Sequence, residues 1–346
     1  MKKLIASFVL LLSLGCFKAN AQNLDDPGGY LSAINSANVE MSKTYMAYIS
    51  AAAHSGRARK IERMRQQTVD AIINCRGKIS ELPYYKGDNS LRKSSIDYIG
   101  LVYKVFNDDY AHIVNMEEIV EQSFDEMQLY LLLQEKTNDT LKAANDRMDQ
   151  AVTDFAAKYN VKLLNDKSEL GQKMDQAGKV SKYRDKVYLL FFKCNWQENQ
   201  LTDALNKKNT IKIEQARSAL SNYASDGLAA LDSLKSFQND PSLAVACKQA
   251  LTFYKKEADV DIPKVSDFML KEENFNKIKA SFDATPQSSR TQKDVDAYNK
   301  AVNEMNGAVN VANQTNANLN NNRKQIIDGW NNAEKAFNDN HVPFYK

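Results

Sequence analysis

Apolar residues recur every three or four positions along much of the chain, which is the period of a helix with one buried face. The longest such run alternates steps of three and four from Val295 to Phe337, and eleven of its thirteen positions are apolar or aromatic. A heptad pattern of this length predicts one long helix. Further runs of the same kind predict helices over residues 30–45, 61–79, 116–155, 180–204 and 213–237.

Residues that interrupt helices are scarce. The 346 residues include only 12 glycines and 6 prolines, and neither type occurs between Leu101 and Leu170. A β protein of this size needs many turns, so the pattern predicts an all-α fold. We expect an elongated antiparallel bundle of about seven long, heptad-patterned helices.

Two loops are candidate points for subdividing the bundle, which is expected to occupy residues 22–346. They lie at residues 83–89 and 239–241. In the second loop, Asp240 is the expected N-cap and Pro241 the first residue of the next helix. We find no internal repeat strong enough to indicate a solenoid.

Two short runs are apolar on nearly every helical face, namely residues 129–133 and 187–192. A helix that is apolar all round is buried on all sides. If the chain reverses near Asn160, an antiparallel hairpin places the two runs side by side. The pattern therefore predicts that Leu132 and Leu190 lie in the middle of the core.

The N-terminal 21 residues have the features of a cleaved secretory signal peptide. Lys2 and Lys3 precede an apolar stretch over residues 4–14, and Ala19-Asn20-Ala21 is a typical cleavage site. Cleavage after Ala21 leads us to expect an extracytoplasmic protein, either periplasmic or on the cell surface. The less favoured alternative is a lipoprotein anchored through Cys16, because Ser13 occupies the position at which a lipobox has leucine.

Removal of this segment changes the charge balance. The full chain has a net charge of +3, but without the three signal-segment lysines the basic and acidic residues are equal at 43 each. Nucleic-acid binders usually carry a basic excess, so we expect no nucleic-acid partner. No later apolar run reaches the length of a membrane span, so we expect no transmembrane anchor after cleavage.

Three cysteines stay in the mature chain: Cys75, Cys194 and Cys247. An oxidising compartment permits a disulfide, but an odd number leaves at least one thiol. Cys75 and Cys194 fall on apolar helical stripes, which favours small buried core residues. One disulfide stays possible, and the sequence does not identify its pair.

Candidate catalytic and metal-binding groups are few. The histidines are His54, His112 and His341, and the first and last are expected at the surface. Asp109 and His112 share a helical face near several glutamates, but di-iron bundles need a second histidine on another helix. The acidic pair around Val260 lacks the glycine turn and final glutamate of a calcium loop. We therefore predict no catalytic, cofactor-binding or metal-binding residues, no cofactor, and a protein that is not an enzyme.

Two other features leave alternatives open. Adjacent Tyr84 and Tyr85 in the 83–89 loop either contact a partner or pack on the end of the bundle. An asparagine-rich stretch covers residues 310–322, and Asn316 and Arg323 interrupt the apolar seam. Either this stretch faces water, or both residues form a buried polar layer, in which case Arg323 needs a carboxylate partner.

These observations favour an exported, non-enzymatic helical bundle that serves as a surface or envelope interaction or structural protein, with an unidentified protein or cell-envelope partner. The alternatives are a membrane-active protein that inserts the apolar hairpin, and a periplasmic ligand-binding protein. The Ala19-Asn20-Ala21-Gln22 site followed by an all-helical chain resembles uncharacterised exported surface proteins of Gram-negative bacteria. This resemblance is one of architecture, implies the same location, and identifies no functional residue.

Overall fold

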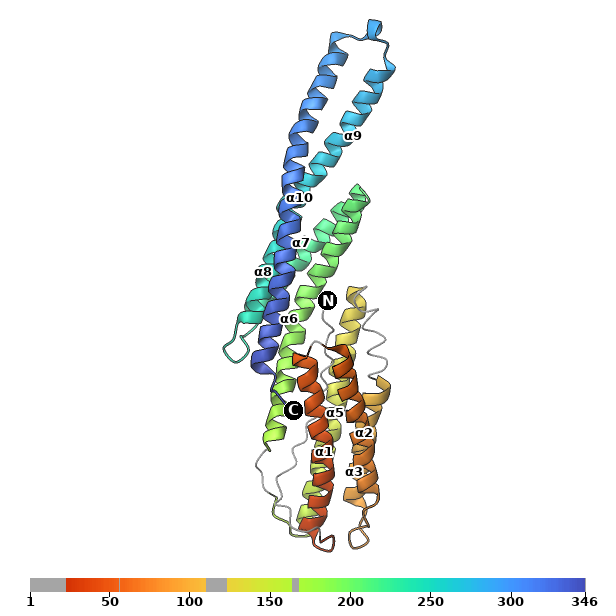
Figure 1. Cartoon of the computed structure of the whole chain (residues 1–346), viewed down its shortest axis with the longest axis vertical. Helices are drawn as coiled ribbons and strands as arrows, with labels where there is room; N and C mark the ends of the chain where they lie inside the picture. The colour runs from red at the N-terminus through yellow and green to blue at the C-terminus, as the bar shows by residue number, and fades with distance from the viewer. Residues whose placement is uncertain (1–22, 56, 110–122, 164–167, 346) are drawn as a thin grey trace. The chain divides into compact units, whose positions relative to one another are not determined.

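The computed structural model describes residues 23–55, 57–109, 123–163 and 168–345, and within them the regular structure is helical. The all-α class is thus confirmed for this part of the chain (Figure 1). The predicted signal peptide and Cys16 lie outside the described residues. The elements in chain order are α1 (Pro27–His54), α2 (Ala58–Ser80), α3 (Ser90–Lys104), the π-helix η1 (Val105–Asp109), α5 (Phe124–Lys158), α6 (Glu169–Asn206), α7 (Thr210–Ser233), α8 (Ser242–Lys256), the π-helix η2 (Glu257–Asp261), α9 (Ile262–Ala284), the 3₁₀ turn η3 (Gln287–Ser289) and α10 (Gln292–His341).

The chain divides into two compact units. Unit 1 comprises residues 1–185 and 335–346, and unit 2 comprises residues 186–334, so the boundaries fall inside α6 and α10. The loops at 83–89 and 239–241, where the sequence suggested a subdivision, lie within unit 1 and unit 2, respectively. The elongated, antiparallel arrangement of the whole chain stays a prediction.

Local sequence explains where several helices begin. Before α1, Asp26 accepts a hydrogen bond from Gly29 N at 2.8 Å, and Pro27 starts the helix. Asn209 caps α7 in the same way through Lys212 N at 3.0 Å. Such side chains satisfy backbone N–H groups that have no partner within the helix. The α8 start differs by one residue from the prediction, because Pro241 is the N-cap and α8 begins at the next residue.

A repeated segment is the main feature that the sequence analysis missed. Adding 152 to the bounds of α3 gives those of α8, and the same shift relates η1 to η2 and the first residue of α2 to that of α7. The ends of α1 and α6, His54 and Asn206, obey the same shift. We name residues 58–109 repeat 1 and residues 210–261 repeat 2. The chain is thus a tandem pair, not a solenoid.

The turn that precedes the second helix of each repeat has the same geometry. In repeat 1, Asp88 N donates to Tyr85 O at 2.8 Å, and in repeat 2, Asp240 N donates to Phe237 O at 2.8 Å. The two residues between each pair have positive φ, including 82° at Gly87. A two-residue turn with both central residues left-handed is typical of type I′. Each aspartate then accepts from the backbone N–H two residues later, which starts the following helix.

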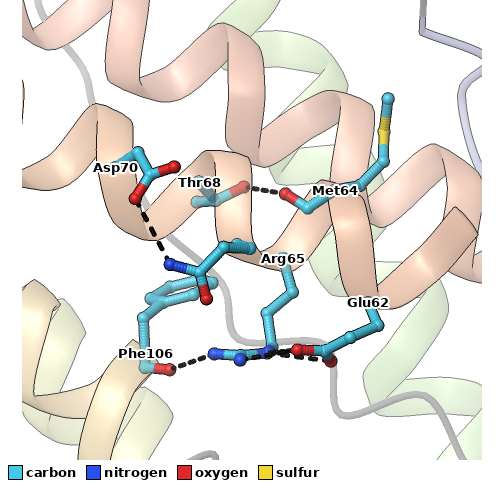
Figure 2. A network of polar contacts seen from close by, with 7 residues as sticks. Glu62, Met64, Arg65, Thr68, Asp70 and Phe106 are labelled. Atoms are coloured by element: carbon cyan, nitrogen blue, oxygen red, sulfur yellow. Dashed lines mark hydrogen bonds and ion pairs between the residues drawn. The ribbon is translucent and has the colours of Figure 1, made fainter. Parts of the chain in front are cut away.

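An arginine joins the first helix of each repeat to its π-helix. Arg65 donates to the carbonyl of Phe106 in η1 at 3.4 Å, and Figure 2 shows its guanidinium held against Glu62 on the same helix. In repeat 2, Arg217 donates to Ala258 O in η2 at 3.4 Å and pairs with Glu214. A π-helix displaces the regular i→i−4 pairing, so the arginine supplies a donor to a carbonyl at each irregularity.

Aromatic side chains form part of the unit 1 core. Tyr85 is 2% exposed, and its ring centroid lies 5.3 Å from Tyr30 and 5.2 Å from Phe155. Its neighbour Tyr84 is 53% exposed and lies under the Arg92 guanidinium. Tyr85 therefore packs into the bundle, whereas Tyr84 faces solvent.

The prediction for the first apolar run was wrong at two positions. Leu129 and Leu132 on α5 are 49% and 59% exposed, because helical rotation turns them away from the face that buries Met127 and Leu141. The second run behaves closer to expectation: Val187, Phe191 and Phe192 are buried, whereas Tyr188, Leu189 and Leu190 are half-buried. The described part of α5 ends at Lys158, and Asn160 has positive φ in the following turn.

The C-terminal residues dock on α1. The His54 side chain, only 9% exposed, places Nδ1 3.0 Å from Asp339 Oδ1 and Nε2 3.1 Å from Val342 O. Its ring stacks on Phe344 at 3.7 Å, and Tyr345 N donates to Ser50 Oγ. The expectation of a surface position for His54 was therefore wrong, because contacts distant in sequence cover it.

Candidate functional site

A buried charged cluster in unit 2 joins α6, η2 and α10. Arg323 on α10 lies with Nε 2.7 Å from Glu198 Oε1 on α6, and its Nη2 pairs with Glu257 Oε1 in η2. Glu198 is 7% exposed and Glu257 is fully buried at 0%. We name Glu198, Glu257 and Arg323 the charged triad. Two carboxylates thus share one guanidinium in a site shielded from water.

Burial dominates the electrostatics of the triad. It raises the pKa of Glu257 to about 7, although the Arg323 guanidinium acts in the opposite direction. Glu257 Oε2 has no hydrogen-bond partner among the described residues, so its ionised form lacks the full set of donors that a buried carboxylate needs. Nearby, Tyr254 donates to Asn195 Oδ1 at 3.0 Å, and burial raises the pKa of this tyrosine.

Repeat 1 shows that the fold does not need this triad. The shift of 152 residues pairs Glu257 with Val105 and Glu198 with Met46, and both are buried apolar residues. The same backbone geometry is thus compatible with an apolar site. Buried ion pairs are weak evidence for stability, since desolvation opposes their attraction. The difference between the repeats therefore marks the triad as a specialised feature of unit 2.

The triad lies at the base of a two-helix hairpin in unit 2. We name residues 266–311 the arm; it comprises most of α9, the turn and the start of α10. Figure 1 shows that, within unit 2, this hairpin extends past the ends of α6 and α7. Its helices contact through Tyr298, whose ring stacks on Phe282 at 4.6 Å and lies 6.0 Å from Phe275.

The apolar side chains of the arm are poorly covered. In α9 the buried residues are Ile262 and Val265, at its first turn. Beyond them, Phe268, Phe275 and Phe282 follow one another at seven-residue intervals and are each half-buried. Leu270 is 58% exposed. An amphipathic helix normally buries such a stripe against another element.

Unit 1 contains a small polar recess between α1 and the start of α6. It has about 260 Å³ of space, part of it open solvent, and Asn38, Ser42, Ser168 and Met174 contribute to its lining. Asn38 is 1% exposed, and its Nδ2 has no hydrogen-bond partner among the described residues. Pockets for metabolites are usually larger and mostly apolar. The recess is therefore suited to ordered water.

The sequence candidates fall into two groups. His112 and the glutamates after it lie outside the described residues, as does the side chain of Asp109. Arg323 has the carboxylate partners that a polar layer would require, whereas Asn316 is exposed, so only half of that alternative holds. His341 ends α10 and is half-buried.

The cysteines fit the interpretation as buried core residues. Cys75, Cys194 and Cys247 are buried and free, and burial raises the pKa of the first two to about 12. In the described part of the chain, no three histidine, cysteine or acidic side chains converge as a metal site would require. The helices described also include none with the length and apolarity needed to cross a membrane.

Comparison with protein-family models, with curated proteins and with solved structures gives no match. Sequence reasoning anticipated only Arg323 among the triad residues. The signal that could have found its partners is the repeat itself, because an offset of 152 aligns Lys60-Ile61-Glu62 with Lys212-Ile213-Glu214. In this alignment Glu257 is equivalent to a valine in repeat 1, so its charge stands at a position where the other repeat is apolar.

Proposed function

We propose that this chain is an exported, non-enzymatic interaction protein of the cell envelope or surface, and that the arm is its binding element. The observation that supports this most is the aromatic stripe of α9 at residues Phe268, Phe275 and Phe282, which stays half-buried despite the ring contacts between the two arm helices. A large apolar patch on a soluble protein commonly marks an interaction site. The proposal includes the elongated antiparallel bundle and its heptad pattern as the scaffold that presents the arm.

The favoured occupant of the arm is an amphipathic helix from a partner protein. Val295, Val302 and Val309 on α10 repeat at the same seven-residue interval as the phenylalanines on α9. Two helices with heptad stripes leave a groove that a third helix can fill by knobs-into-holes packing. The arm has six basic and seven acidic residues, so its charge does not favour a polyanionic partner.

Site-specific photo-cross-linking in intact cells tests this assignment. A photoreactive residue replaces Phe275, which lies half-buried in the aromatic stripe of the arm, and in a control it replaces Val245, which is 47% exposed on α8. We expect a cross-linked adduct with a second protein from position 275 and none from position 245. Mass spectrometry of the adduct should identify a helical segment of that protein.

Three results would overturn the proposed binding role. These are an absence of adducts at position 275, equal adducts at both positions, and an adduct that contains two differently tagged copies of this chain. The last result would assign the arm to self-association instead.

Export is tested separately by sequencing the N-terminus of the purified native protein. Cleavage after Ala21 predicts a mature chain that begins at Gln22. A chain that retains Met1 would contradict export by this route, and an acylated Cys16 would support the lipoprotein alternative. Protease treatment of intact cells then separates a surface location from a periplasmic one.

A further inference from the structure

We infer that the charged triad is a pH-sensitive latch that fixes the base of the arm to the body of unit 2. This inference rests on the proposed function of the arm and adds its regulation. The triad is placed for this role because Glu257 lies in η2, which leads directly into α9, while Arg323 lies on α10, the second helix of the arm. Glu198 pairs with Arg323 and so joins α10 to α6.

The junction between η2 and α9 is a weak point in the backbone. Pro263 lies in the first turn of α9 and has no N–H to donate across the junction. The π-helix before it already departs from regular helical pairing. Side-chain contacts to η2 therefore add to the attachment that the continuous helix α10 provides between the arm and the body.

Ionisation of Glu257 opposes this attachment. The protonated carboxyl is neutral and can accept a hydrogen bond from Arg323, whereas the carboxylate places a second negative charge beside Glu198 at a fully buried position. Raising the pH through neutrality therefore favours states in which η2 separates from α10 and Glu257 reaches solvent. The groups around η2 that act on this equilibrium are Glu198 and Cys194 on α6, Arg217 on α7, Tyr254 and Lys256 on α8, Asp261 in η2, Lys264 on α9 and Arg323 on α10.

Repeat 1 provides an internal reference without a latch. Its π-helix has Val105 at the position of Glu257 and the same arginine link to the preceding helix. Any general effect of pH on π-helices or on the exchange chemistry acts on η1 and η2 alike. Only η2 should show the additional dependence caused by its carboxyl group.

Hydrogen exchange of the full chain, followed by mass spectrometry at pH 6 and pH 8, tests the latch without a partner. The pKa of Glu257 is about 7 when η2 is packed on α10 and 4.5 when η2 has separated and the carboxyl is in solvent. The equilibrium constant for the opening of η2 should therefore rise about tenfold between these pH values. Peptides that cover η1 should show no such rise after correction for intrinsic exchange rates. In E257Q the rise at η2 should disappear, since glutamine does not titrate.

A rise of the same size in E257Q, or equal changes at η1 and η2, would overturn the latch. If E257Q fails to fold, E257V, which copies the residue of repeat 1, takes its place and should also lose the pH response. The two proposals can fail independently. A normal exchange response without adducts at position 275 would refute the binding role alone, and adducts without the exchange response would refute the latch alone.

Discussion

Replacing Glu257 by glutamine should stabilise unit 2 at alkaline pH and leave it nearly unchanged at acid pH. Glutamine keeps the size of the side chain and an oxygen acceptor for Arg323, but it cannot ionise. Because burial raises the pKa of Glu257 from 4.5 to about 7, the folded state binds this proton more tightly than the unfolded state. The stability that the protonated group contributes is fully present below pH 4.5 and is lost as the pH rises to about 7.

The size of this effect follows from the pKa shift. Each pKa unit corresponds to about 1.4 kcal/mol, so the complete loss in the native protein is about 3 kcal/mol. Most of it, about 2.5 kcal/mol, should fall between pH 5 and pH 8. The difference in the free energy of unfolding between E257Q and the native protein should grow by this amount over the same interval.

Urea unfolding followed by tryptophan fluorescence suits this measurement, because both tryptophans, Trp196 and Trp330, belong to unit 2. Trp330 is buried and stacks on Phe191 at 4.2 Å, so its emission should change when unit 2 unfolds. E304Q is the matched control, since the Glu304 side chain is 45% exposed. A difference that does not grow with pH, or an E257Q variant that is less stable at pH 8, would refute the reasoning that desolvation outweighs the Arg323 pairing.

Three further predictions concern the packing. Leu201→Ala, at a fully buried position, should lower the free energy of unfolding by about 2–5 kcal/mol, and Leu132→Ala, at an exposed one, by less than about 0.5 kcal/mol, measured by circular dichroism in urea. Equal costs would contradict the burial assigned to α5 and α6. Arg217→Ala should remove the donor to Ala258 O and cost about 1 kcal/mol; faster hydrogen exchange confined to η2 would support this, and unchanged exchange would not. His54→Ala should release the C-terminal residues, so that carboxypeptidase removes them faster than from the native protein, and equal rates would argue against docking.

The hydrophobic period identified most helices because burial of one helical face repeats every 3.6 residues whatever the partner is. It predicted a single helix over residues 295–337, which α10 contains. The prediction that Leu132 is buried was wrong, because a helical run that is apolar on every face gives no indication of which face packs on the core. The outer side of α5 stays exposed there.

The repeat escaped sequence analysis because the two copies preserve geometry with few identical residues. Identical residues recur only in short stretches, such as Lys60-Ile61-Glu62 with Lys212-Ile213-Glu214 and the aspartates before the second helix of each repeat. At equivalent core positions the two repeats carry different side chains, as with Val105 and Glu257. Packing tolerates such exchanges when neighbouring residues compensate.

The sequence by itself determined the helical class, the principal breaks and the need of Arg323 for a carboxylate. These properties depend on local period, on turn residues and on the cost of burying a charge. Only the tertiary structure decided that Glu198 and Glu257 meet this arginine, that His54 holds the C-terminal residues, and that the arm leaves its phenylalanines half-exposed. Such outcomes depend on which faces of helices far apart in the sequence pack together, and no local pattern contains that choice.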